Sequence, residues 1–204
     1  MSLLMRFYIY FLRFIYYFMK LRKTRNRIVF LSRQSNDISL DFKLLKKEIE
    51  KQNSDVEIKV ITKKIEKKVS SVIKGFFVIL KSMYYLATSK IAIIDGYNIQ
   101  ISTLKHKDDL KVFQIWHSLA AVKKFGLDAL NTKKDKKIAK VMLMHNGYDY
   151  VNSGSDYMKP FFSKAFGYTD DKLVSLGLPR IDYLVTNYKV LKCYNYYRYI
   201  LFYF

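Results

Sequence analysis

The stretch KIAIIDGY (90–97) places a run of apolar residues directly before an aspartate and a glycine. A short β-branched run bounded by a turn signal is typical of a strand buried on both faces, as in parallel sheets. Further runs of this type are RIVFLS (27–32), VEIKVIT (56–62), KVFQIWH (111–117), YDYVNSG (148–154) and KLVSLGL (172–178). Helical patterns lie between them, near 39–52, 70–88, 133–145 and 155–166. The alternation predicts an α/β fold in which helices cover both faces of a parallel sheet.

Polar residues and glycines gather where these runs end. The ends carry Ser32-Arg33-Gln34, Asp95-Gly96-Tyr97, His117-Ser118, Gly154-Ser155 and Gly177 through Arg180. Ligands of open α/β sheets bind outside the carboxyl ends of the strands, so we expect a site at this edge. The chain has no G-x-G-x-x-G after its first strand and no G-x-x-x-x-G-K-[ST] motif. A dinucleotide-binding fold or a P-loop NTPase is therefore disfavoured.

His117 is the candidate catalytic residue because an imidazole that titrates near neutral pH can act as a general base. A strand-end histidine bonded to backbone is an equally good interpretation of the spacing. Lys123 and Lys124 are candidates for phosphate binding, with a solvated face as the alternative, and Trp116 is expected in the core. His106 and His145 lie in polar surroundings and are expected at the surface. The full set predicted to bind the acceptor or its phosphate is Arg33, Asp95, Lys123, Lys124, Ser155 and Arg180.

The charge of the chain indicates an anionic partner. Its 204 residues suit one domain, or one domain with an appendage, and carry 37 Lys+Arg against 17 Asp+Glu, a formal net charge of +20. Nucleic acid, anionic lipid and a phosphorylated substrate all fit this sign. We expect no nucleic acid partner, because the basic residues are dispersed and no nucleic-acid motif is present. A single cysteine and the lack of zinc-site spacing predict no metal site.

The amino-terminal residues 1–25 predict an amphipathic helix. Arg6, Arg13 and Lys20 recur every seventh residue and so share one helical face, opposite Leu, Ile, Phe and Met side chains. Cations inside the apolar run disfavour a membrane span, and the basic flank follows that run, which disfavours a signal peptide. The pattern fits a helix on an anionic membrane surface, and we expect a peripheral protein at the cytoplasmic face of the cell membrane. The alternative is a terminal helix packed on the protein's own surface.

Several motifs, taken in order, resemble a known family. IVFLSRQSN, IIDGYNI, QIWHSLAAVKKFG, YDYV and GLPRIDYL are similar to the amino-terminal half of the CDP-glycerol glycerophosphotransferase family of teichoic acid biosynthesis, over roughly 27–184. The resemblance implies the amino-terminal, Rossmann-like domain of a GT-B fold. It implies transfer of glycerol or ribitol phosphate from a CDP-linked donor to a lipid-linked glycerol-phosphate acceptor, with His117 as base and no cofactor. Ser118 and the LAA that follows replace a glycine and a small-glycine pattern common in the family.

The resemblance also predicts how the chain is divided. Residues 1–25 form the membrane-associating helix, 26–186 the acceptor-side domain and 187–204 an aromatic-rich tail at a truncation point. The family's second domain, which binds CDP, has no counterpart in these residues. We therefore expect an acceptor-side half that is inactive alone, arising by natural truncation, by a frameshift or as part of a split enzyme whose other domain is a separate chain. A non-catalytic module that binds a membrane or a partner with the same fold is the alternative.

Overall fold

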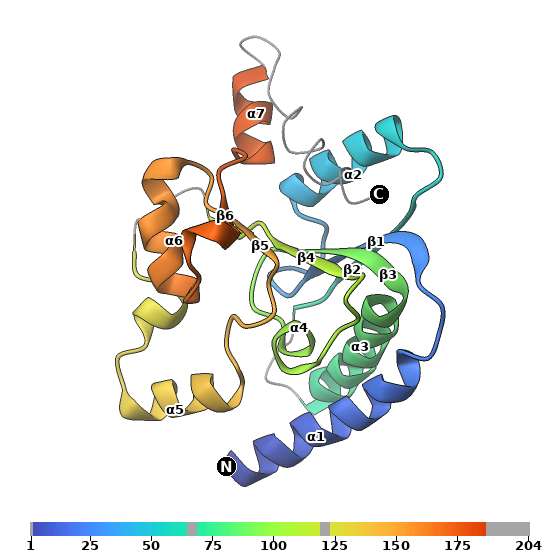
Figure 1. Cartoon of the computed structure of the whole chain (residues 1–204), viewed down its shortest axis with the longest axis vertical. Coiled ribbons are helices and arrows are strands. Elements are labelled where there is room, and N and C mark those ends of the chain that lie inside the picture. The colour runs from blue at the N-terminus through green and yellow to red at the C-terminus, as the bar shows by residue number, and fades with distance from the viewer. Residues whose placement is uncertain (1, 65–68, 119–122, 187–204) are drawn as a thin grey trace.

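The structure, a computed structural model describing residues 2–64, 69–118 and 123–186, is built on one parallel sheet (Figure 1). Its strands pair in the order β2-β1-β3-β4-β5-β6, and every pair is parallel. The strands are β1 (Arg25–Ser32), β2 (Glu57–Thr62), β3 (Ser89–Ile94), β4 (Lys111–Gln114), β5 (Tyr150–Asn152) and β6 (Leu173–Val174). Each lies within or next to a predicted run, so the predicted α/β parallel sheet is confirmed.

The helices fill the intervals between the strands. They are α1 (Ser2–Met19), α2 (Leu40–Gln52), α3 (Val69–Thr88), α4 (Ile99–Thr103), α5 (Lys133–Val141), α6 (Lys159–Phe166) and α7 (Pro179–Thr186), with 3-10 turns at Gly126–Ala129, Asp156–Met158 and Asp170–Lys172. The helix predicted at 155–166 is a 3-10 turn followed by α6. Helices α4 and α7 were not predicted, because they are too short to show a periodic apolar pattern.

Alternate residues of the central strands face opposite sides of the sheet. Ile28 and Phe30 of β1 pack with α2, while Val29 and Leu31 pack in a second core with α1 and α3. Both cores consist of fully buried aliphatic and aromatic side chains. The helices therefore cover both faces, as predicted, with α1, α3, α4 and α6 on one face and α2 on the other.

Helix α1 is part of the larger core. Leu12 and Tyr16 are 0% and 1% exposed, and α1 crosses α3 on the outside of the sheet (Figure 1). Its opposite side is an uncovered apolar row, consisting of Leu3, Leu4, Phe7, Phe14 and Phe18, with Phe11 at its margin against Phe76 of α3. The helix thus packs on the protein through one face and leaves another apolar face open. Among the described residues, no helix is long and apolar enough to cross a membrane.

The strand order creates a switch point between β1 and β3. The connection from β1 leads outward to β2, and the next connection returns across β1 to β3. Where neighbouring strands send their connections in opposite directions, their carboxyl ends leave a crevice that commonly binds ligands. The predicted residues Arg33 and Asp95 directly follow these two strands.

The predicted tail at 187–204 lies outside the described residues.

Candidate functional site

A strained turn after β4 presents His117 at the carboxyl edge of the sheet. Trp116 has a φ of 58°, in the left-handed region that non-glycine residues rarely adopt. The buried side chain of Gln114 supports this turn, accepting a hydrogen bond from the Trp116 N–H at 2.8 Å and donating one to the Gly96 carbonyl at 3.2 Å. The indole packs on Phe125 and Phe166 against the core, as predicted for Trp116. Strain held by surrounding contacts is common at functional sites.

His117 has one ring nitrogen fixed and the other free. Its Nδ1 lies 2.8 Å from the backbone oxygen of Asp95. Since a carbonyl oxygen only accepts, Nδ1 carries the proton and donates it, which leaves the Nε2 lone pair as an acceptor. The ring is exposed, and among the described residues Nε2 has no hydrogen-bond partner. This is the tautomer and orientation that a general base requires.

Asp95 supplies a buried carboxylate beside the imidazole. The residue is 2% exposed, and its Oδ1 has no hydrogen-bond partner within the described part of the chain. Burial raises the pKa of this carboxyl, while a hydrogen bond with Ser32 and the charge of His117 oppose the rise. The adjacent Gly96 lets the side chains of Gln34 and His117 approach the backbone closely, because a Cβ there would lie 2.7 Å from Gln34 Nε2 and 3.9 Å from His117 Nδ1.

Arg180 joins three segments at this edge. Its Nε donates to Asp41 Oδ2 at 2.7 Å and its backbone N–H donates to Asp41 Oδ1 at 2.9 Å. Its Nη1 donates to the backbone oxygen of His117 at 3.1 Å. The hydrogen bond that its side chain donates to Asp41 raises the pKa of Arg180, so the guanidinium stays charged and tethered. Arg180 therefore positions His117, in addition to any contact with a phosphate.

Of the other predicted site residues, Arg33 and Ser155 follow strands at the same edge, and among the described residues neither they nor Lys123 and Lys124 form a hydrogen bond with His117. Arg33 is half-buried near Tyr97. Burial raises the pKa of Tyr97, and the positive charge of Arg33 opposes this rise. Ser155 is exposed at the start of the 3-10 turn before α6, and its hydroxyl makes no capping hydrogen bond. Lys123 and Lys124 line a separate cavity of about 450 Å³ against α6. The LAA segment that departs from the family pattern lies outside the described residues.

The expectation that His106 and His145 lie at the surface was wrong. His145 is 1% exposed, with Nδ1 3.0 Å from the hydroxyl of Tyr148. His106 is largely buried, with Nδ1 2.7 Å from the hydroxyl of Tyr16 and Nε2 3.1 Å from the Ile101 oxygen. Their polar sequence neighbours face solvent, whereas the rings pack under α1 and behind Trp116. Burial lowers the pKa of both rings to about 4.

Sequence reasoning missed two contributors to this site. Asp41 was recognisable only as an acid in the first turn of α2, a position that favours negative charge at any helix. Gln114 lies inside an apolar run and carries no pattern that marks it, whereas Gln34 belongs to the predicted strand-end group Ser32-Arg33-Gln34. No group of three or more possible metal ligands occurs among the residues that the structure describes.

Comparisons with known proteins point to one family. The family model described as CDP-glycerol:poly(glycerophosphate) glycerophosphotransferase matches residues 14–195. A teichoic acid glycerol-phosphate primase of Bacillus subtilis (strain 168) is 35% identical over 106 residues, covering 51% of this chain and 28% of that protein. A teichoic acid ribitol-phosphate primase of Bacillus spizizenii is 25% identical over 160 residues, covering 78% of this chain and 41% of that protein. The chain thus spans less than half the length of either relative.

Solved structures support the fold. The wall teichoic acid polymerase TagF superposes with a TM-score of 0.60 at 15% identity, covering 92% of this chain and 49% of that chain. At this identity the likeness shows the architecture alone, and that architecture is the GT-B type that the sequence resemblance predicted.

Proposed function

The chain belongs to the CDP-glycerol:poly(glycerophosphate) glycerophosphotransferase family, and from this premise we propose that it is the acceptor-side half of a teichoic-acid-type phosphotransferase. Its substrates would be a CDP-linked glycerol or ribitol donor and a lipid-linked glycerol-phosphate acceptor. The observation that carries this proposal is the imidazole of His117, whose Nδ1 is fixed on the Asp95 carbonyl while the residue is exposed at the carboxyl edge of the sheet.

In the proposed step His117 acts on the acceptor. Nε2 takes the proton of an acceptor hydroxyl as the hydroxyl oxygen attacks the β-phosphorus of the donor. The new bond joins that oxygen to phosphorus, the bond from phosphorus to the oxygen of CMP breaks, and CMP leaves with the electron pair. An in-line displacement of this kind depends mainly on positioning and on charge that stabilises the phosphoryl oxygens.

Asp95 and Arg180 support the base in different ways. When His117 becomes an imidazolium, the nearby buried carboxylate of Asp95 favours the positive charge. Arg180, bonded to the His117 oxygen, keeps the backbone of the turn in place. Asp95 thus acts on the charge of the base, and Arg180 acts on its position. We also propose that Arg180 contacts the phosphate of a substrate. The other proposed phosphate contacts are Arg33, Ser155, Lys123 and Lys124.

The donor requires a second binding surface. A GT-B transferase reacts between two domains, and nucleotide binding must fix the phosphates and the base. The described residues form one domain, and the chain covers 28% and 41% of the two primases. We propose that the groups that bind CDP lie on a second domain, which could belong to a separate chain.

Release of CMP tests this function. The chain is incubated with CDP-glycerol or CDP-ribitol and a lipid-linked acceptor, alone and together with the carboxyl-terminal domain of a related transferase. We expect no turnover by the chain alone, weak turnover in the mixture, and none in the mixture with His117→Ala. If mixtures with the wild-type chain and with His117→Ala release CMP equally, His117 is not the base. Robust release by the 204-residue chain alone would show that no second domain is needed.

We also propose that the protein binds the cytoplasmic face of the cell membrane through α1. The support is its uncovered apolar row, in which Leu3, Phe7 and Phe14 are 80%, 71% and 65% exposed. Co-sedimentation with anionic vesicles tests this, and Phe7→Ser with Phe14→Ser should reduce binding. The same row favours the second candidate function, a non-catalytic membrane-binding module. Vesicle binding without CMP release in the complemented mixture would support that candidate.

A further inference from the structure

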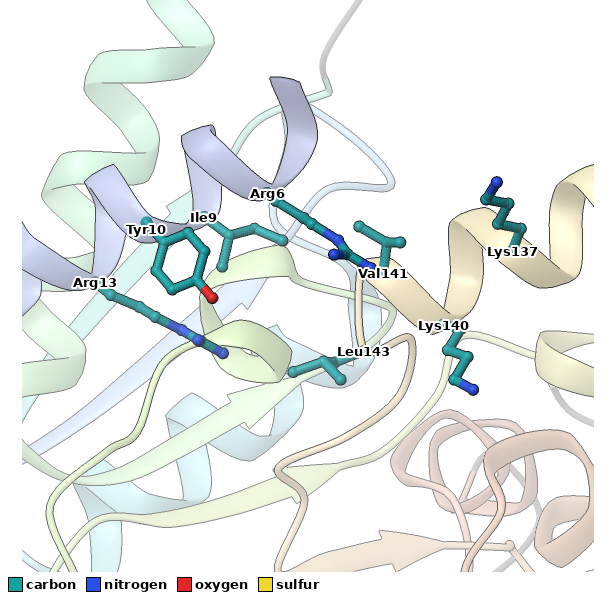
Figure 2. Close-up of a pocket in the computed structure, with 8 residues that line it drawn as sticks. All are labelled: Arg6, Ile9, Tyr10, Arg13, Lys137, Lys140, Val141 and Leu143. Carbon is teal, nitrogen blue, oxygen red and sulfur yellow. The ribbon is translucent and has the colours of Figure 1, made fainter. Parts of the chain in front are cut away.

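A cationic hollow lies between α1 and α5, away from His117 (Figure 2). It holds about 450 Å³ and is lined by Arg6, Ile9, Tyr10 and Arg13 of α1, and by Lys137, Lys140, Val141 and Leu143 of α5 and the turn after it. Figure 2 shows Arg6 extending from α1 toward Val141 at the end of α5 and Arg13 extending toward Leu143, with Ile9 between the two arginines. Two arginines thus flank a small apolar floor, and Lys137 and Lys140 line the hollow from α5 with side chains that extend away from the arginines.

The cations of this hollow are not neutralised by the protein. Within the described part of the chain, Arg6, Lys137 and Lys140 form no ion pair and no hydrogen bond. Arg13 donates only its Nε, to the Thr103 oxygen at 2.8 Å, and lies 5.7 Å from the Tyr10 ring centre. Its two terminal nitrogens remain available. Like charges held close together without a counter-charge are unfavourable unless an anion offsets them.

The hollow adjoins the uncovered apolar row of α1. Arg6 and Arg13 lie on the flank of the helix between the buried side that carries Ile9 and Leu12 and the exposed side that carries Phe7 and Phe14. A second cationic hollow of about 380 Å³ continues along this flank, lined by Arg13, Tyr16, Tyr17, Lys20 and Lys105. A membrane that accepts the apolar row would therefore place its phosphates level with these cations.

We propose that the hollow between α1 and α5 binds the phosphate of an anionic membrane lipid. The guanidinium groups of Arg6 and Arg13 bind the phosphate oxygens, since planar guanidinium matches this geometry. Lys137 and Lys140 add charge from the rim, and Ile9 and Leu143 contact the apolar part of the same lipid. Four cations favour a phosphate with two negative charges over a singly charged diester.

This inference rests on the proposed membrane binding by α1 but is tested separately from it. Lysines are labelled with an amine-reactive reagent, with and without vesicles of phosphatidylcholine containing phosphatidic acid or phosphatidylglycerol, and read by mass spectrometry. We expect Lys137 and Lys140 to be protected severalfold, more by phosphatidic acid at equal surface charge. Lys43 and Lys47 of α2, exposed on the other face of the sheet, are the internal control.

Paired variants measure the contribution to affinity. Arg6→Gln with Lys137→Gln should weaken binding to anionic vesicles by about thirtyfold, as expected for two cations close to an anionic surface. Lys43→Gln with Lys47→Gln removes the same charge from α2 and should change binding less than twofold.

The outcomes separate the two proposals. Failure of the full chain to bind any vesicle overturns membrane binding and this inference with it. Binding with unprotected Lys137 and Lys140 overturns this inference alone. Protection of both lysines by soluble glycerol 1-phosphate as strongly as by vesicles would mean that the hollow takes a free phosphate, and would overturn the lipid assignment.

Discussion

At the scale of single residues, the site depends on a few positions where backbone shape is fixed. Trp116 keeps a left-handed conformation because Gln114 holds its N–H and aromatic neighbours hold its indole. Gly126, with a φ of 57°, lies against the backbone oxygen of Ala165 and close to His145. These positions hold the turn after β4 and the segment that follows it against α6.

Gly126 and Gly177 form a matched pair of substitutions. Both have positive φ, but a Cβ at Gly126 would collide with the Ala165 backbone oxygen, whereas a Cβ at Gly177 meets nothing within 4 Å. We expect Gly177→Ala to cost about 1 kcal/mol from conformation alone, and Gly126→Ala to cost about 3 kcal/mol or more. Urea unfolding of the two variants measures the difference. Equal losses would mean that α6 moves to accommodate the new methyl group.

The buried histidines make stability depend on pH. Burial lowers the pKa of His106 and His145 to about 4 in the folded chain, whereas an unfolded histidine titrates near 6.5. Below about pH 6.5 the unfolded chain therefore binds protons that the folded chain does not, and stability falls as the pH drops. Between pH 7 and 5 we expect a loss of about 2 kcal/mol for each histidine. Urea unfolding at both pH values checks this, and His145→Gln should remove about half of the dependence.

At the scale of elements, α2 and α7 are joined by one buried carboxylate. Asp41 is 2% exposed and binds both the side chain and the backbone N–H of Arg180, which begins α7 with Pro179. The contact spans 139 residues of sequence, so no local pattern could reveal it. It closes the carboxyl edge of the sheet behind His117.

We predict that Asp41→Ala costs about 2–3 kcal/mol, because it leaves Arg180 partly buried without its partner and α7 without a cap. The matched control is Glu50→Ala, which removes the exposed Lys46–Glu50 pair of α2 and should cost less than about 0.5 kcal/mol. Urea unfolding compares the two. A loss for Asp41→Ala no larger than that for the control would show that the tether contributes little.

Helix α1 has a side that packs in the core and another side through which we propose lipid contact. Leu12 is 0% exposed and Phe14 is 65% exposed, on opposite sides of one helix. We expect Leu12→Ala to cost about 3 kcal/mol of folding free energy and Phe14→Ala to cost less than about 0.5 kcal/mol in the absence of lipid. For vesicle binding we expect the reverse order of the two variants, with Phe14→Ala weakening the affinity about tenfold. Removing residues 1–25 is a poor substitute for this pair, because it would also expose the core under Leu12.

The sequence predicted most elements because each strand of a parallel sheet is a short apolar run, whatever its neighbours. It predicted the amphipathic character of α1 from Arg6, Arg13 and Lys20, with a membrane surface or the protein's own surface as alternatives for its apolar side. It did not predict that one apolar side packs on the protein while another stays exposed. That division depends on which residues of α3 and α4 lie beneath it. The burial of His145 escaped prediction for the same reason, since Phe166 and Tyr148 cover it only after the chain has folded.

At the scale of the whole molecule, the net charge of +20 attracts an anionic surface over a distance that depends on the ionic strength. The screening length falls from about 8 Å at physiological ionic strength to about 3 Å at 1 M. We predict that affinity for anionic vesicles falls more than tenfold across this range and approaches the weaker affinity for neutral vesicles, which depends on the apolar row of α1. Sedimentation at increasing salt tests this. Affinity for anionic vesicles that does not change with salt would exclude an electrostatic contribution.

The strand order also bears on how the protein is made. Strands β1, β2 and β3 are neighbours, and each later strand joins the edge left by the one before it. A ribosome that releases about 5–20 residues per second therefore delivers each strand when its docking edge already exists. The nascent sheet needs no strand to wait for a later one. Helix α1 must wait for α3 and α4, and Asp41 must wait until Arg180 emerges. Synthesis and assembly of this domain can thus proceed in the same direction.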